Sequence, residues 1–239
     1  MHQPGRYDKD ETQEGQMNRW ILTSFLLFAV FSVGASQSIK RCGAKVGATS
    51  STWDWQTGGS TNQGVDARLG IDVGAYVEWF NVPAFSLISE LHFVQKGMKE
   101  DIPITTQQYP NGTGEFVKHS IRLDYLSFGI LPKVRFETGV AEVYGIAGLR
   151  VDISLSNNVA VEGREPLRTQ SAQSFQYLVD RFKNPEVGGT VGIGVQSDSL
   201  LPLPVGIEVR YSPNFQNGYS TSIWTIRNTS FEFLLIVSM

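Results

Sequence analysis

Long segments in which apolar and polar side chains alternate constrain the fold of this chain most strongly. From residue 69 to 79 the odd positions are Leu, Ile, Val, Ala, Val and Trp, and the even positions are Gly, Asp, Gly, Tyr and Glu. A period of two predicts a β-strand with one apolar face. Similar alternation recurs at 143–155, 187–195 and 205–211. Ordinary strands run about five or six residues, whereas a tilted strand needs about 9–11 to cross a bilayer. The length of these segments therefore favours strands that span a membrane.

Weaker alternation completes a set of about eight strands. The further predicted strands cover 39–49, 85–97, 121–136 and 229–237. Short connections at 81–84, 137–140 and 197–204 alternate with long polar ones at 50–66, 98–120, 156–186 and 214–225. This asymmetry is typical of outer-membrane barrels, whose long loops face outward. We predict an all-β fold, a single closed antiparallel up-and-down transmembrane β-barrel preceded by a signal peptide.

Two local features modify this prediction. Pro132 cannot donate a ladder hydrogen bond, which predicts a bulge or a strand end there. In the third long loop, Phe175, Leu178, Val179 and Phe182 fall at helical spacing and predict a helical turn or two over 175–182.

The N-terminal segment has the pattern of a secretory signal peptide. Residues 17–20 supply a positive start, 21–33 an apolar run, and Val33-Gly34-Ala35 small residues for cleavage. An apolar run of about 13 residues is short of the roughly 20 that a transmembrane helix needs. We therefore predict a signal peptide at 17–36 and a barrel at 37–239. Residues 1–16 are predicted to be disordered, or an extension upstream of the true start at Met17.

Composition excludes several classes of function. The net charge is -3, so no basic field recruits nucleic acid. The single cysteine, Cys42, allows no internal disulfide, and no Cys/His spacing predicts zinc. Charged residues at 40–41 disfavour a lipid-modified Cys42. The chain has three histidines and no nucleophile signature, although His119 with Asp101 and Glu115 offers acid/base groups. We expect no enzymatic activity and no cofactor.

Several motifs resemble the PorT-type outer-membrane β-barrel family common in Bacteroidota. They are Glu90-Leu91 followed by Gln95-Lys96-Gly97, the run from Leu123 to Lys133, Gly145 to Leu149, Gly189 to Gly194 and Glu208 to Pro213. The resemblance covers roughly residues 42–237. Two departures are Gly129, where many members have proline, and a chain end at Ser238-Met239 in place of a terminal aromatic residue. The resemblance implies an integral outer-membrane location, with a link to type IX secretion in the founding member.

Charged residues on the polar faces of the predicted strands would point into the barrel lumen. They are Glu78, Glu90, His92, Lys96, Arg150, Asp152, Glu208, Arg210 and Glu232. A narrow lumen holds such groups only as paired ions, because an unpaired buried charge costs several kcal/mol. We predict a structural salt-bridge network that plugs the lumen, and consider an ion or proton path the lesser alternative.

Aromatic residues in or beside the long loops are candidates for contact with a partner, for glycan binding or for the membrane interface. They are Trp53, Trp55, Tyr109, Phe116, Tyr219 and Trp224.

Two functions remain open on sequence alone. The first is an integral outer-membrane protein with a plugged lumen and a structural or accessory role in the envelope or in secretion, acting through its extracellular loops. Its expected partners are outer-membrane lipids, the barrel-insertion machinery and envelope or secretion proteins. The alternative is a soluble periplasmic lipocalin-like barrel that binds a small apolar ligand.

Overall fold

The computed structural model describes residues 39–57, 60–61, 65–105, 107–110, 112–198, 203–221 and 224–239. Residues 40–239 form one compact unit. The predicted upstream extension and signal peptide lie outside the described residues.

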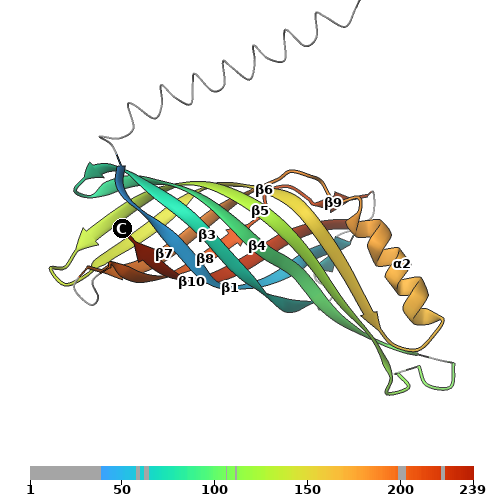
Figure 1. Cartoon of the computed structure of the whole chain (residues 1–239). Coiled ribbons are helices and arrows are strands. Elements are labelled where there is room, and N and C mark those ends of the chain that lie inside the picture. The colour runs from blue at the N-terminus through green and yellow to red at the C-terminus, as the bar shows by residue number, and fades with distance from the viewer. Residues whose placement is uncertain are drawn as a thin grey trace, which may run out of the picture. The chain divides into compact units, whose positions relative to one another are not determined.

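Eight long antiparallel strands form a closed barrel (Figure 1). They are β1 (Ile39–Thr57), β3 (Asp66–Val82), β4 (Phe85–Pro103), β5 (Phe116–Glu137), β6 (Glu142–Glu162), β7 (Glu186–Ser197), β8 (Val205–Pro213) and β10 (Trp224–Ser238). Each strand pairs with the next along the chain, and β10 pairs with β1 from Gly43↔Ser238 to Thr57↔Trp224. The two-residue strands β2 (Ser60–Thr61) and β9 (Tyr219–Ser220) extend this sheet at β1 and β10. The all-β up-and-down barrel predicted from the sequence is confirmed.

The connections differ at the two ends of the barrel. The end that holds the β3–β4, β5–β6 and β7–β8 connections, together with the C-terminus, is called the turn end below. In the β5–β6 turn the amide of Thr138 donates to the carbonyl of Ala141 over 2.9 Å, and Gly139 has a φ of 84°, which favours glycine. The opposite end is called the loop end. There β4, β5 and β6, with 19, 22 and 21 residues, are much longer than β8 with 9.

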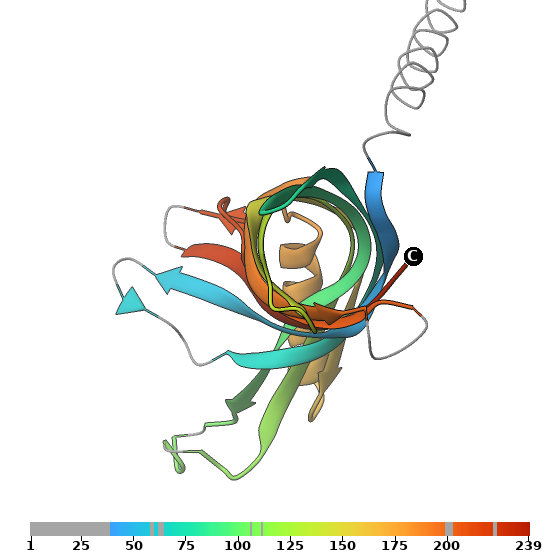
Figure 2. The same cartoon turned by 90° about the vertical axis from the view of Figure 1, so that its left-hand side faces the viewer.

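Among the described residues the helix is α2 (Leu167–Val179), which follows β6 at the loop end. Viewed along the barrel in Figure 2, α2 lies within the outline of the strands, and Figure 1 shows it at one end of them. The predicted helical turn at 175–182 was placed too far along the chain: the helix begins at Leu167 and ends at Val179. The apolar residues at helical spacing mark only the part of the helix that packs against the barrel. Residues 167–170 at its start are exposed, so the apolar pattern does not reveal them. Within the described residues, no helix has the length and hydropathy of a membrane span.

Two further local predictions are corrected. Pro132 is neither a strand end nor a bulge: it lies inside β5 opposite Leu87, and the β5–β6 register is the same at Ile130↔Leu149 and Lys133↔Ile146. The irregularity in β5–β6 lies instead at Asp124/Tyr125. The first predicted loop also begins too early, because β1 continues to Thr57.

The outer face of the barrel is apolar. On β10, Phe231, Phe233 and Leu235 are 50%, 55% and 59% exposed, while the residues between them are buried. The same alternation runs through Val191 and Ile193 of β7. The inner face carries most of the buried charged residues. This is the reverse of the lipocalin-like alternative, which required an apolar interior and a polar exterior.

Candidate functional site

The barrel interior is the candidate site, and ion pairs cross it at its middle. Going round the ring in the order β1-β3-β4-β5-β6-β7-β8-β10, β4 and β8 are four strands apart in either direction, so they lie opposite each other. Arg210 of β8 donates from Nη1 and Nη2 to the two carboxylate oxygens of Glu90 of β4, over 2.5 and 2.7 Å. This bidentate contact is the strongest geometry for an arginine–carboxylate pair. It joins opposite walls of the barrel.

Two further charges complete the middle cluster of Lys45, Glu90, Glu208 and Arg210. Lys45 Nζ lies 3.2 Å from Glu90 and 3.1 Å from Glu208, and Arg210 Nε donates to Glu208. All four residues are at most 6% exposed. Two cations therefore face two carboxylates, so the cluster is neutral in a place where an unpaired charge would be costly.

Hydrogen bonds extend the middle cluster. Tyr144 donates its hydroxyl to Glu208 over 2.7 Å. Nδ1 of His92 lies 2.5 Å from Asp72, and its Nε2 lies 3.5 Å from Glu90. His92 is thus held between two carboxylates.

A second group of ion pairs lies nearer the loop end. Lys96 Nζ contacts Asp152 at 2.6 Å, and Arg150 bridges Asp152 at 3.1 Å and Glu232 at 3.4 Å. Beside them Tyr125 donates its hydroxyl to Glu186 over 2.5 Å.

A polar contact also crosses the barrel at this level. Asn228 of β10 donates to the hydroxyl of Tyr125 over 3.0 Å. Since β5 and β10 are also four strands apart in the ring, this contact likewise joins opposite walls.

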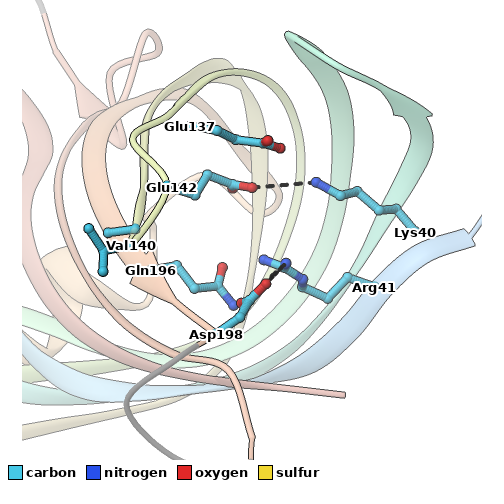
Figure 3. A pocket seen from close by; sticks show the side chains of 9 residues that line it. Lys40, Arg41, Glu137, Val140, Glu142, Gln196 and Asp198 are labelled. Carbon is cyan, nitrogen blue, oxygen red and sulfur yellow. Dashed lines mark hydrogen bonds and ion pairs between the residues drawn. The ribbon is translucent and has the colours of Figure 1, made fainter.

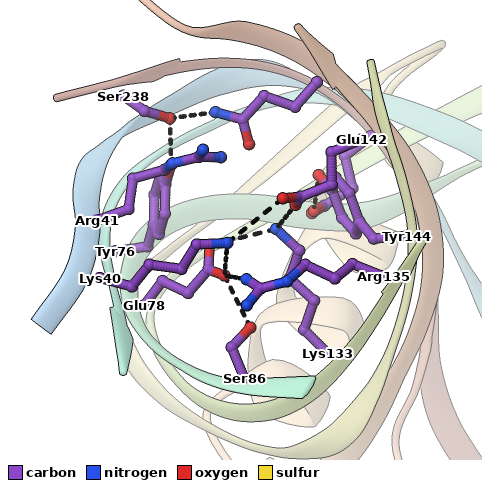
Figure 4. A network of polar contacts seen from close by, with 12 residues as sticks. Lys40, Arg41, Tyr76, Glu78, Ser86, Lys133, Arg135, Glu142, Tyr144 and Ser238 are labelled. Atoms are coloured by element: carbon purple, nitrogen blue, oxygen red, sulfur yellow. Dashed lines mark hydrogen bonds and ion pairs between the residues drawn. The ribbon is translucent and has the colours of Figure 1, made fainter. Parts of the chain in front are cut away.

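A third group, the turn-end cluster, is centred on Glu78 (Figure 4). Lys133 Nζ and Arg135 Nη1 lie 3.2 and 2.8 Å from the Glu78 carboxylate, and Ser86 donates to it over 2.8 Å. Lys133 also lies 2.5 Å from Glu142. Lys40 completes the cluster, 3.5 Å from Glu78 and 3.4 Å from Glu142.

Apolar side chains fill the loop end. The loop-end apolar cluster consists of the buried residues Trp53, Met98, Ile121, Leu123, Tyr125, Leu178, Val179 and Ile226. Leu178 and Val179 come from α2, and Phe182, just after it, stacks on Trp53 with ring centroids 5.0 Å apart. The helix therefore packs onto the interior of the barrel at this end.

A pocket of about 310 Å³ lies at the turn end (Figure 3). It is lined by Lys40, Arg41, Glu137, Gly139, Val140, Ala141, Glu142, Gln196 and Asp198. Four of its charged side chains form two pairs: Lys40 bonds Glu142, and Arg41 lies 3.3 Å from Asp198. Within the described part of the chain, no group of three or more His, Cys, Asp or Glu residues is arranged to hold a metal ion.

A match to a protein-family model shows which family this chain belongs to. Residues 35–220 match the model described as the outer membrane protein beta-barrel domain. The chain belongs to that family. This outer-membrane barrel is therefore an integral protein of the outer membrane, and its apolar outer face is the surface that contacts lipid.

Solved structures of other barrels resemble this one in fold alone. Ail of Yersinia pestis, determined with the heparin analogue sucrose octasulfate, is 11% identical, covering 83% of this chain and 98% of its own, with a TM-score of 0.39. OprG of Pseudomonas aeruginosa is 10% identical, covering 83% and 95%, with a TM-score of 0.42. The Escherichia coli outer membrane protease OmpT is 9% identical, covering 84% and 96%, with a TM-score of 0.40. No curated protein matches the sequence.

All nine charged residues proposed from the sequence are buried in the interior of the outer-membrane barrel. Glu90, Glu208 and Arg210 meet in the middle cluster, with His92 beside them. Lys96, Arg150, Asp152 and Glu232 form the second group, and Glu78 is the centre of the turn-end cluster.

Sequence reasoning missed several members of these clusters. Lys45 and Lys40 lie in the weakly alternating first strand, and Lys133 and Arg135 lie in a strand that is apolar on both sides in its middle. The signal for the latter pair was their parity: outward positions of β5 are even-numbered, so 133 and 135 face inward.

The aromatic candidates separate into buried and exposed groups. Trp53 and Trp55 belong to β1 and not to a loop; Trp53 is 2% exposed, so it is not available for contact with a partner or with lipid. Trp55 and Tyr219 pack against the loop-end apolar cluster. Tyr109, Phe116 and Trp224 are 60%, 47% and 42% exposed. His119 is buried in β5 and stacks on Phe175 at 4.6 Å.

Proposed function

We propose that this outer-membrane barrel is a non-conducting scaffold with a plugged lumen. The observation that carries the proposal is the bidentate Glu90–Arg210 bridge between opposite walls. The Tyr125–Asn228 contact and the loop-end apolar cluster add further obstructions along the same axis. Eight strands also enclose an interior just wide enough for side chains to fill.

With its lumen filled, the protein acts through its surface. We assign it a structural or accessory role in the envelope or in secretion, exerted through loops that face the outside of the cell. Exposed aromatic residues at the loop end, among them Tyr109, Tyr177 and Trp224, support contact with partner proteins there. The barrel-insertion machinery is the partner expected to read β10, whose outward residues include Phe231 and Phe233.

We also infer that the protein is of the PorT type within its family. The residues that carry this resemblance have definite structural roles: Glu90 binds Arg210, Lys96 binds Asp152, and Gln95 donates to Asp124 over 3.0 Å. A link to type IX secretion is the finer role that this resemblance suggests.

Conductance tests the plugged lumen. Purified protein reconstituted into planar bilayers is expected to give no current steps above the protein-free baseline. Discrete openings of the wild-type protein, in samples whose heat-modifiable gel migration shows a folded barrel, would contradict the proposal.

Surface labelling tests the orientation. In a Cys42→Ser background, Gln108→Cys in the loop after β4 is expected to react with a membrane-impermeant maleimide on intact cells. The matched control, Val140→Cys in the β5–β6 turn, is 70% exposed as valine. It should react only after the outer membrane is permeabilised. The reverse pattern would place the loop end in the periplasm.

A further inference from the structure

On β4 and β5 the apolar band on the outside of the barrel ends at a border on the loop-end side. The outward residues of β5 are apolar without interruption, in the order Phe136, Val134, Pro132, Ile130, Phe128 and Leu126. Ten residue steps of a tilted strand rise about 25 Å, which is the height of the apolar band of a transmembrane barrel. The row above Leu126 therefore lies at the membrane–water interface.

On β4 the apolar row ends at the same level, with Phe93, whereas on β6 it reaches Leu155 and on β3 it continues through Ile71 to Leu69. Leu126 pairs with Phe93 of β4 and with Ile153 of β6. One row further, Asp124 pairs with Gln95 and Ser156, and both donate to its carboxylate, over 3.0 and 2.8 Å.

Two arginines occupy this border. Arg122 of β5 lies with its Nε 3.3 Å from Asp124, and its side chain is 42% exposed. Ala67 of β3 pairs with Met98 of β4, and the neighbouring Gly97 pairs with Arg122, so Arg68 and Arg122 lie on either side of Gly97. Gly97 of β4, opposite Arg122, contributes no side chain between them.

The charges at the border do not balance. Two guanidinium groups face the single carboxylate of Asp124, which is already bonded by Gln95 and Ser156. The Nη1 atom of Arg68 is buried and makes no hydrogen bond. Buried polar groups are almost always hydrogen-bonded, and among the residues that the structure describes none accepts a hydrogen bond from this donor. In the next two rows outward each lysine has a carboxylate opposite it: Lys99 faces Asp66, and Lys118 faces Asp101 and Glu162.

We propose that Arg68 and Arg122 bind the phosphate of a lipid headgroup in the outer leaflet. Guanidinium groups pair with phosphate through two parallel hydrogen bonds. A lipid suits the position better than a soluble anion, because the apolar residues Leu126, Phe93 and Ile153 lie directly below and contact its acyl chains. The choice of leaflet depends on the orientation proposed above, and the labelling experiment tests that orientation separately.

Binding of bis-phosphorylated lipid A to the purified protein in detergent tests the site. Arg68→Gln/Arg122→Gln is expected to weaken binding at least about tenfold, since each charge-assisted hydrogen bond contributes roughly that factor. The matched control, Arg164→Gln/Arg168→Gln, makes the same charge change beside and within α2 and should bind as the wild type does. Arg122→Gln alone, at a half-exposed position, provides a second variant if the double variant does not give the heat-modifiable band of a folded barrel.

Two further probes identify the source of the phosphate. Dephosphorylated lipid A should bind the wild type as weakly as lipid A binds the double variant. Millimolar inorganic phosphate should not displace lipid A. Equal binding of the wild type and both arginine variants, or of lipid A with and without phosphate, would overturn the proposal. Displacement by inorganic phosphate would overturn the assignment to a lipid.

Discussion

The loss of stability on removing one charged residue from the lumen depends on whether its partner is left without an opposite charge. Arg210 holds both Glu90 and Glu208, and Lys45 alone would remain to balance them. A buried pair contributes little net stability over an apolar pair of similar size, whereas a pair with one member removed is strongly destabilising. The clusters are therefore best understood as sets that must be changed together.

Arg210→Met is expected to lower the free energy of unfolding by about 3–5 kcal/mol, because it leaves two carboxylates with one cation. Glu90→Met/Arg210→Met should lower it less, since Lys45 and Glu208 then remain as a neutral pair. Urea titration in detergent, followed by heat-modifiable migration, measures both. Glu90→Met completes the set of variants. A double variant that loses as much stability as Arg210→Met and Glu90→Met lose together would show that the bridge is not coupled.

Outward positions are sensitive to charge according to their depth in the membrane. Val73→Arg, near the middle of the apolar row of β3, should cost about 2–4 kcal/mol of stability in lipid vesicles. Leu69→Arg, nearer the loop end on the outer face of the same strand, should cost about 0–1 kcal/mol. Equal costs at the two positions, measured by urea unfolding in vesicles, would argue against the membrane border inferred for β3.

At the scale of elements, α2 is a separate piece of the interior. Its polar face is exposed, and Arg168 and Thr169 both donate to Glu165 before its start. Its other face supplies Leu178 and Val179 to the loop-end apolar cluster. The strands form the closed barrel by pairing with one another. The helix therefore covers one end of the barrel and is not needed for barrel closure.

Replacing residues 166–180 by a Gly/Ser linker of equal length is expected to leave the barrel folded and to open the loop end. Ile226→Cys, buried in the intact protein, should become reactive to maleimide after this replacement in a Cys42→Ser background. Trp224→Cys, at an exposed position, should react in both proteins. If Ile226→Cys stays unreactive while the linker variant is folded, other segments close this end.

The sequence predicted the strands well where apolar and polar residues alternate strictly. It predicted the bounds of α2 poorly, because only part of the helix packs against the barrel. Val143–Leu155 and Thr229–Val237 alternate cleanly, and both strands were predicted. Ile88 and Val94 break the pattern of β4 because the interior is partly apolar: both are buried. The same mixture concealed Lys133 and Arg135. The position of Trp53 depends on its contact with Phe182, about 130 residues away, and no local pattern reports such a contact.

At the scale of the whole molecule, the barrel separates two surfaces of opposite character. Charged groups are paired inside, and apolar side chains cover the outside from the turn end to the border beside Leu126. This arrangement explains how a chain with a net charge of -3 and many charged residues belongs in a membrane. The orientation of each side chain follows from strand parity alone, so a shift of one residue in register would exchange the two surfaces.

Spin-label accessibility along β10 tests whether its two faces are separated in this way. Single labels at residues 231 to 237, introduced into the Cys42→Ser protein in lipid vesicles, are examined for collisions with oxygen and with a water-soluble nickel complex. We expect high oxygen accessibility at 231, 233, 235 and 237, and low accessibility to both reagents at 232, 234 and 236. Oxygen accessibility without a period of two, or higher nickel accessibility at the odd positions, would contradict this separation of the two faces.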